Sequence, residues 1–257
     1  MKRTIIRIIL LITIMVFIIA ILFLPIPSLK RTNMQEYFIA HAGGEIDGFS
    51  YTNSVEAVIN SINNEFKYIE LDISLTTDSQ LVCMHSPSEF IEMTNLPDSI
   101  MLTADVFNRQ TILEKYTPLS LSKLVDLQKR FNFVLVLDKT SNPQLLDNYL
   151  ADIRQHVMVE SFSVKDYFEL YDLGYIPMLS LYYNGYLRPM VSLCSKYNIK
   201  WISTTVQNYR DLINIHILKF IFGVKVAAYT TVPTKFLKYV GSEIDLLYVD
   251  YNIAEGY

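Results

Sequence analysis

The sequence is poor in the residues that mark a disulfide-rich or zinc-binding scaffold. It holds two cysteines, Cys83 and Cys194, in 257 residues. The first falls near a predicted strand end and the second in a predicted peripheral helix, so we expect two separate buried thiols and no disulfide. No spacing of Cys and His typical of zinc ligands occurs either.

Dense basic clusters are missing beyond the amino terminus, and the formal net charge is −4. A nucleic-acid-binding surface needs such clusters, so we exclude a nucleic-acid partner. The sequence also lacks a G-x-G-x-x-G turn after its first predicted strand. This absence argues against an open sheet of the dinucleotide-binding kind.

One long apolar run stands at the amino terminus. From Ile8 to Leu24 its only polar residue is Thr13, and three basic residues precede it. As a helix the run is long enough to cross the roughly 30 Å hydrocarbon core of a membrane. We therefore expect residues 1–27 to form a single-pass transmembrane anchor, with the amino terminus cytoplasmic and the following domain extracytoplasmic. A cleaved signal peptide is the alternative, but no small-x-small cleavage site follows the run.

After a polar linker over residues 28–36, short apolar runs alternate with amphipathic segments, which is typical of parallel strands with crossover helices. Eight strands are expected, over residues 37–40, 68–74, 133–138, 157–162, 177–181, 200–204, 224–230 and 246–250. Helices are expected over residues 54–63, 119–130, 143–155, 164–173, 187–197, 209–220 and 234–241. This spacing predicts an α/β fold, a (β/α)8 TIM barrel over residues 37–257.

The connection after the second strand is much longer than the others. It holds a further strand-like piece at residues 80–85 and then an insertion at about 86–117 that is rich enough in apolar residues to pack. Long connections that follow a barrel strand usually lie over the active face. We therefore expect the insertion to cover the site.

A Glu-x-Asp pair in the second strand is the first candidate for chemistry. Residues two apart in a strand face the same way, so the carboxylates of Glu70 and Asp72 should converge among apolar neighbours. Two buried like charges need a cation or several donors, and an all-oxygen ligand set favours Mg²⁺ or Ca²⁺ over zinc. Asp138 ends the third strand at the same face, as a third carboxylate or as a cap, and Lys139 beside it could contact phosphate.

Two histidines end strand-like segments near this pair. A single histidine there is more often structural, but His41 and His85 can both reach the barrel mouth, where one could accept a proton and the other donate one. Tyr229 also lies near a strand end and either lines the pocket or packs.

The runs IAHAGG, TNSVEAV and YIELDISLTTDSQLVCMH resemble the glycerophosphodiester phosphodiesterase family, whose pattern is H-R-G, E-N-T-x-x-A-F, I-E-x-D-V-x-x-T-x-D-G and V-x-x-H-D. The family is a (β/α)8 barrel with an insertion after its second strand. The resemblance implies metal-assisted cleavage of a phosphodiester. We expect a glycerophosphodiester, either a small molecule or a group in a lipid headgroup or a polyol-phosphate polymer. The roles that the resemblance implies are metal ligands (Glu70, Asp72, Asp138), an acid–base pair (His41, His85) and substrate contacts (Lys139, Tyr229).

Three departures from the family pattern affect phosphate recognition and site support. Ala42 replaces the motif arginine, Thr52 replaces the Glu of E-N-T, and Ser79 replaces a turn glycine. Because lysine does not reproduce the bidentate grip of arginine, we expect an altered substrate. Two other functions stay open: a phospholipase-type lyase that forms a cyclic phosphate, and a barrel that binds a ligand without catalysis.

Overall fold

In the computed structural model, residues 2–22, 24–28, 34–139, 142–181 and 187–250 are described. Eight parallel strands form a closed barrel in the order β1-β10-β9-β8-β7-β6-β5-β2, and pairing of β1 with β2 closes it. Its strands are β1 (Phe38–Ala40), β2 (Tyr68–Leu75), β5 (Val134–Asp138), β6 (Val157–Ser161), β7 (Ile176–Ser180), β8 (Trp201–Thr205), β9 (Lys225–Tyr229) and β10 (Leu246–Val249). The predicted barrel is confirmed, and each strand end differs from its predicted position by at most one residue.

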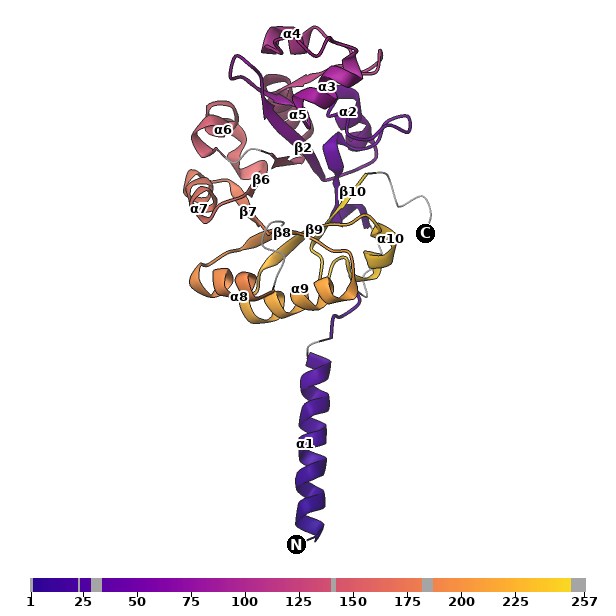
Figure 1. Cartoon of the computed structure of the whole chain (residues 1–257), viewed down its shortest axis with the longest axis vertical. Coiled ribbons are helices and arrows are strands. Elements are labelled where there is room, and N and C mark those ends of the chain that lie inside the picture. Colours follow the sequence, from indigo (N-terminus) through magenta and orange to yellow (C-terminus); the bar gives the residue numbers. More distant parts are fainter. Residues whose placement is uncertain (1, 23, 29–33, 140–141, 182–186, 251–257) are drawn as a thin grey trace.

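Helices surround the barrel (Figure 1). They are α2 (Val55–Asn63), α5 (Leu121–Phe131), α6 (Pro143–Leu150), α7 (Val164–Leu173), α8 (Leu187–Lys196), α9 (Tyr209–Phe222) and α10 (Pro233–Phe236). Short 3₁₀ turns are η1 (Met34–Tyr37), η2 (His41–Gly43), η3 (Ala151–His156) and η5 (Leu237–Tyr239). The predicted helix over 143–155 is thus divided between α6 and η3, and the one over 234–241 is divided between α10 and η5.

The strands are buried on both faces, as parallel strands between helices and a filled barrel interior must be. A large cluster joins their outer faces to the helices. A smaller cluster fills the interior and consists of Ile39, Val136, Met158, Met178, Ala227, Leu246 and Tyr248. Cys83 and Cys194 are both buried and unpaired, as expected.

The insertion after β2 packs around a core of its own. Two antiparallel strands, β3 (Leu81–Cys83) and β4 (Leu119–Ser120), extend the sheet at β2, and α3 (Pro87–Thr94) and α4 (Ala104–Asn108) lie beyond them. The rings of Phe90 and Phe107 stack at 4.5 Å in its centre. The predicted insertion is therefore an ordered subdomain.

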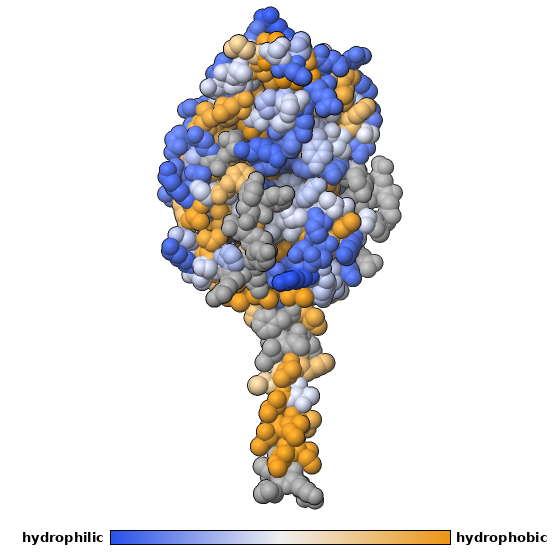
Figure 2. All heavy atoms as spheres, viewed as in Figure 1, coloured by the Kyte–Doolittle hydropathy of each residue, from blue (hydrophilic) through white to orange (hydrophobic). Residues whose placement is uncertain are grey.

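Helix α1 (Lys2–Leu22) projects away from the barrel (Figure 1), and its side chains from Ile5 to Phe17 are exposed. Figure 2 shows this stalk as mostly apolar. Within the described part of the chain, however, no helix is both long and apolar enough to cross a membrane, so the predicted transmembrane helix is not found there.

The turn after β1 uses backbone conformations that favour glycine. Ala42 has φ 50° and ψ 40°, and Gly44 has φ 91° and ψ 169°, a region open almost solely to glycine. Ser61 Oγ, on α2, donates to the carbonyl of Gly43 at 2.6 Å. A Cβ at Gly44 would lie 2.2 Å from that Oγ, so residue 44 must be glycine for both conformational and steric reasons.

Substitution of Gly44 should therefore cost more stability than substitution of a glycine with open space around it. We expect Gly44→Ala to lower the free energy of unfolding by about 2–5 kcal/mol, from backbone strain and overpacking together. The matched variant Gly48→Ala, at φ 82° with nothing near its added Cβ, should lose about 1–2 kcal/mol through strain alone. Urea unfolding of both proteins measures the difference, and equal losses would contradict the steric argument.

Candidate active site

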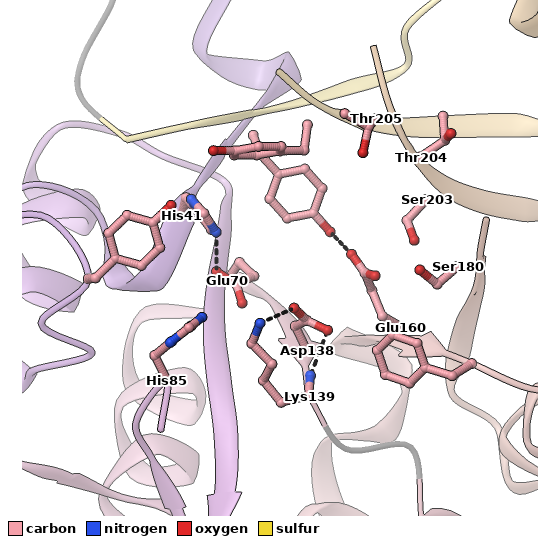
Figure 3. Close-up of a pocket in the computed structure, with 14 residues that line it drawn as sticks. His41, Glu70, His85, Asp138, Lys139, Glu160, Ser180, Ser203, Thr204 and Thr205 are labelled. Carbon is pink, nitrogen blue, oxygen red and sulfur yellow. Dashed lines mark hydrogen bonds and ion pairs between the residues drawn. The ribbon is translucent and has the colours of Figure 1, made fainter. Parts of the chain in front are cut away.

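A cavity of about 580 Å³ opens at the carboxyl ends of the barrel strands (Figure 3). Each of the eight strands, or the residues directly after it, contributes to the wall. The wall is formed by His41, Tyr51, Glu70, His85, Asp138, Lys139, Glu160, Phe162, Ser180, Ser203, Thr204, Thr205, Tyr229 and Tyr248. Six of the seven residues proposed from the sequence are in this wall, and Asp72 lies directly behind it.

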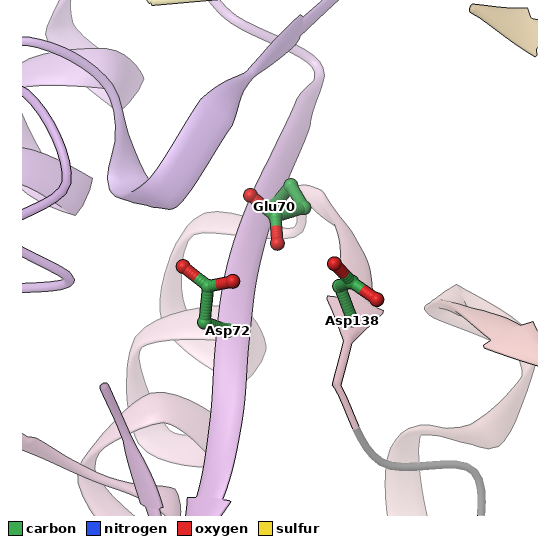
Figure 4. Close-up of side chains that lie close together, drawn as sticks. All are labelled: Glu70, Asp72 and Asp138. Carbon is green, nitrogen blue, oxygen red and sulfur yellow. The ribbon is translucent and has the colours of Figure 1, made fainter. Parts of the chain in front are cut away.

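Three carboxylates meet on one side of the cavity (Figure 4). Glu70 and Asp72 project from β2, and Asp138 is paired with Asp72 in the register of β2 and β5. Each of the three offers an oxygen within 4.8 Å of the others. The convergence expected from strand periodicity is thus present, and the distant Asp138 completes it.

Hydrogen bonds hold the two β2 carboxylates in place. The backbone N–H of Ala42 donates to Glu70 Oε2 at 2.6 Å. Asn53 donates from Nδ2 to Asp72 Oδ2 and accepts the Asp72 N–H, both at 3.0 Å. Ser54, not Asn53, caps α2, by accepting the Ala57 N–H. Asn53, with φ 47°, is therefore left to support the carboxylate site.

The electrostatics of the trio favour a bound cation. Burial, and then the charges of Asp72 and Asp138, raise the pKa of Glu70, and Glu70 Oε1 is buried without a hydrogen-bond partner. Burial also raises the pKa of Asp72, although the bond from Asn53 opposes this rise. A hard divalent ion would neutralise these charges and satisfy the unpartnered oxygen. The three carboxylates therefore fit the predicted Mg²⁺ or Ca²⁺ site.

Lys139 also faces this cluster. Adjacent strand residues normally face opposite ways, but Lys139 has φ 71°, which turns the chain at the end of β5. Its Nζ lies 3.8 Å from Asp72 Oδ1 and 3.6 Å from Asp138 Oδ2. It offers positive charge at the cavity wall beside the proposed metal ligands.

Each candidate histidine is oriented by a carboxylate. His41 Nδ1–H donates to Asp250 Oδ1 at 2.7 Å, which places its Nε2 3.9 Å from Glu70 Oε2. His85 Nδ1–H donates to Glu89 Oε2 at 2.5 Å. Because an ionised carboxylate can only accept, both Nδ1 atoms carry hydrogen and both Nε2 atoms are available to exchange protons.

Two tyrosines of the site, Tyr51 and Tyr248, had no clear signal in the sequence. The ring of Tyr51 lies edge-on to both histidine rings, 4.8 Å from His41 and 5.9 Å from His85. Tyr51 has φ 63°, which directs its side chain to this position, and no local sequence pattern predicts that conformation. Tyr248 OH donates to Glu160 Oε1 at 2.8 Å. Burial, followed by the charge of Asp138, raises the pKa of Glu160 to about 7.

The insertion does not serve as the cover that its length suggested. Among the described residues of the cavity wall, none comes from the range 86–117. The insertion instead supplies Glu89, at the i+4 position from His85 on the first turn of α3. It also joins the first loop of the barrel, where Asp47 pairs with Lys115 and Tyr116. Its contribution to the site is to fix a histidine.

Stability should depend on pH and metal through these buried carboxylates. Because the pKa of Glu70 is raised above its ordinary 4.5, the metal-free folded chain holds a proton that the unfolded chain releases. Stability then falls as pH rises from about 4.5 through the raised value. We expect Glu70→Gln to unfold at a temperature about 2–6 °C higher than the parent without metal at pH 8.

The same variant should lose the rise in unfolding temperature that Mg²⁺ or Ca²⁺ produces in the parent chain, because a metal ligand is gone. Scanning calorimetry at pH 5 and pH 8, with and without the ion, measures both effects. The exposed Glu92→Gln is the matched control. A metal response that persists in Glu70→Gln would rule out Glu70 as a ligand.

Residues 42–161 match the sequence model of the "Glycerophosphoryl diester phosphodiesterase family". No protein with a curated description matches the chain significantly.

Solved structures share the fold at low sequence identity. A Galdieria sulphuraria glycerophosphodiester phosphodiesterase superposes with a TM-score of 0.64 at 18% identity, covering 84% of this chain and 94% of its own. The glycerophosphoryl diester phosphodiesterase domain of a Mycobacterium tuberculosis protein gives a TM-score of 0.65 at 15% identity, over 85% and 97% of the two chains. For an Oleispira antarctica phosphodiesterase the TM-score is 0.60 at 15% identity, over 84% and 93%. The chain is thus similar to the glycerophosphoryl diester phosphodiesterase family over residues 42–161, and it shares the fold of these solved structures over most of its length.

Proposed function

We propose that the barrel hydrolyses a glycerophosphodiester to glycerol phosphate and an alcohol, with a divalent ion and two histidines. One observation carries this proposal: the carboxylate trio shares one cavity with two histidines that carboxylates orient. The Oleispira antarctica structure, which has the same fold, was solved with the product sn-glycerol-3-phosphate. That complex supports the same substrate class here.

Glu70, Asp72 and Asp138 would hold the ion, Mg²⁺ or Ca²⁺. When bound, it neutralises phosphate charge and lowers the pKa of an attacking water or hydroxyl. Lys139 adds a positive charge beside the phosphate position, and Tyr229 lines the same cavity with its ring 5.4 Å from that of His41. We assign substrate binding to these two residues.

We assign His41 as the base and His85 as the acid. Nε2 of His41 accepts a proton from the attacking water, whose oxygen bonds to phosphorus. Nε2–H of His85 gives a proton to the departing alcohol oxygen as the P–O bond breaks. Asp250 and Glu89 hold the two rings in the required tautomer and stabilise the protonated forms.

This division of roles predicts the effect of removing one imidazole. We expect His85→Ala to lower kcat on glycerophosphodiesters by about 10² or more. The exposed His156→Ala, at the end of η3, should leave kcat unchanged. EDTA should stop turnover, and added Mg²⁺ or Ca²⁺ should restore it.

Assays use the full-length chain, with release of glycerol phosphate as the readout. Turnover that is indifferent to EDTA would refute the metal role, and full activity of His85→Ala would refute the acid. A cyclic phosphate as the first product would favour the lyase reaction.

We further propose that residues 1–27 anchor the chain in a membrane, with the amino terminus cytoplasmic and the barrel extracytoplasmic. Supporting this are the exposed apolar side chains of α1 from Ile5 to Phe17 and the three basic residues before residue 8. The backbone N–H of Ile26 donates to Glu243 Oε1 at 2.7 Å, so the chain after α1 is joined to the barrel.

The anchor predicts where the protein is found. Full-length chain should stay in the membrane pellet after alkaline carbonate extraction, and a variant that begins at residue 28 should be released. Protease added to intact cells should digest the barrel. Protection of the barrel in intact cells, with digestion after lysis, would contradict the orientation.

A further inference from the structure

The cavity has a second polar wall that the proposed reaction does not use. In the closed barrel, β7 and β8 lie across from β1 and β2, which carry His41 and Glu70. The hydroxyl groups on this far side, which we call the hydroxyl wall, belong to Ser180, Ser203, Thr204 and Thr205. Figure 3 shows them beside Glu160, on the side of the cavity away from the two histidines.

One hydroxyl of this wall lacks a hydrogen-bond partner. Ser203 is 4% exposed, and its Oγ makes no hydrogen bond of good geometry, although Ser203 and Ser180 both lie near enough to Glu160 to lower the pKa of that carboxyl group. Ser180, on the neighbouring strand, is 5% exposed. The Glu160 carboxylate beside them accepts a hydrogen bond from Tyr248. Because a buried hydroxyl without a partner is costly, its presence in a cavity wall indicates a group that a ligand satisfies.

The chemistry of the wall selects among possible ligands. Serine and threonine hydroxyls both donate and accept, and the Glu160 carboxylate accepts, which suits groups that also do both. Of the described residues that line the cavity, the cation Lys139 lies on the carboxylate side, so the hydroxyl wall offers no charge for a second phosphate. A trimethylammonium group has no donor or acceptor and would leave Ser203 unsatisfied.

An aromatic ring completes this half of the cavity. Phe162 follows β6, lines the cavity and is 43% exposed. An exposed ring beside hydroxyls and a carboxylate can pack against the C–H face of a sugar or a cyclic polyol while the polar groups bond its hydroxyls.

We propose that the hydroxyl wall, with Glu160 and Phe162, binds the alcohol half of the substrate, and that this alcohol is a polyol or sugar. The inference rests on the proposed hydrolysis and adds the substrate class. The scissile phosphate lies at the carboxylate trio, and the hydroxylated leaving group extends across the barrel to β7 and β8. Hydrogen bonds to its hydroxyls then distinguish it from choline esters of the same glycerol phosphate.

The test compares two substrates that differ in this alcohol, glycerophosphoinositol and glycerophosphocholine. We expect kcat/KM to be about tenfold or more higher for the inositol ester. Ser203→Ala and Glu160→Gln should each lower kcat/KM for the inositol ester about three- to tenfold and change that for the choline ester less than twofold. The matched control is Ser195→Ala, on the exposed face of α8.

Equal losses on both esters would overturn the proposal, because they indicate general damage to the site. A wild-type preference for choline would overturn it as well. If the wild type cleaves neither ester, the hydrolysis itself fails, and calorimetric binding of glycerophosphoinositol decides the subsite. Binding that Ser203→Ala weakens and Ser195→Ala does not would support the hydroxyl wall, and binding that neither change affects, or none at all, would overturn it.

Discussion

The repulsion among three clustered carboxylates, two of them buried, governs the arrangement of this barrel mouth. Glu70, Asp72 and Asp138 lie within 4.8 Å of one another, and burial raises the pKa of the two on β2. Such a cluster is stable only if donors and positive charge surround it. Residues near the mouth with unusual backbone conformations supply these hydrogen-bond donors and this positive charge.

The backbone around the mouth is bent to meet this need. The turn at residues 41–44 points the N–H of Ala42 at Glu70, and Asn53, also at positive φ, brackets Asp72 with two bonds. Lys139, at φ 71°, turns its ammonium toward Asp72 and Asp138. Three left-handed backbone conformations thus lie beside the charges, as is common at functional sites, while others, such as those of Asn95 and Asn132, end helices.

The departures from the family pattern affect the grip on phosphate more than the reacting groups. Ala42 has no guanidinium, yet its backbone N–H still donates to Glu70, so the substitution leaves this support of the carboxylate in place. Both histidines have carboxylate partners, one directly after the last barrel strand and one in the insertion. The hydroxyl groups of β7 and β8 line the opposite side of the cavity, where we propose that the alcohol binds.

The sequence by itself determined the eight barrel strands to within one residue, because their apolar runs are local and the barrel keeps them buried on both faces. It also determined that Glu70 and Asp72 share a face, since strand periodicity requires it. Tertiary structure decided the rest. Positive φ at Tyr51 and Lys139 directs their side chains in ways no pattern predicts. Closure of the barrel sets β8 opposite β2, so the hydroxyl wall faces the carboxylates only once all eight strands are paired.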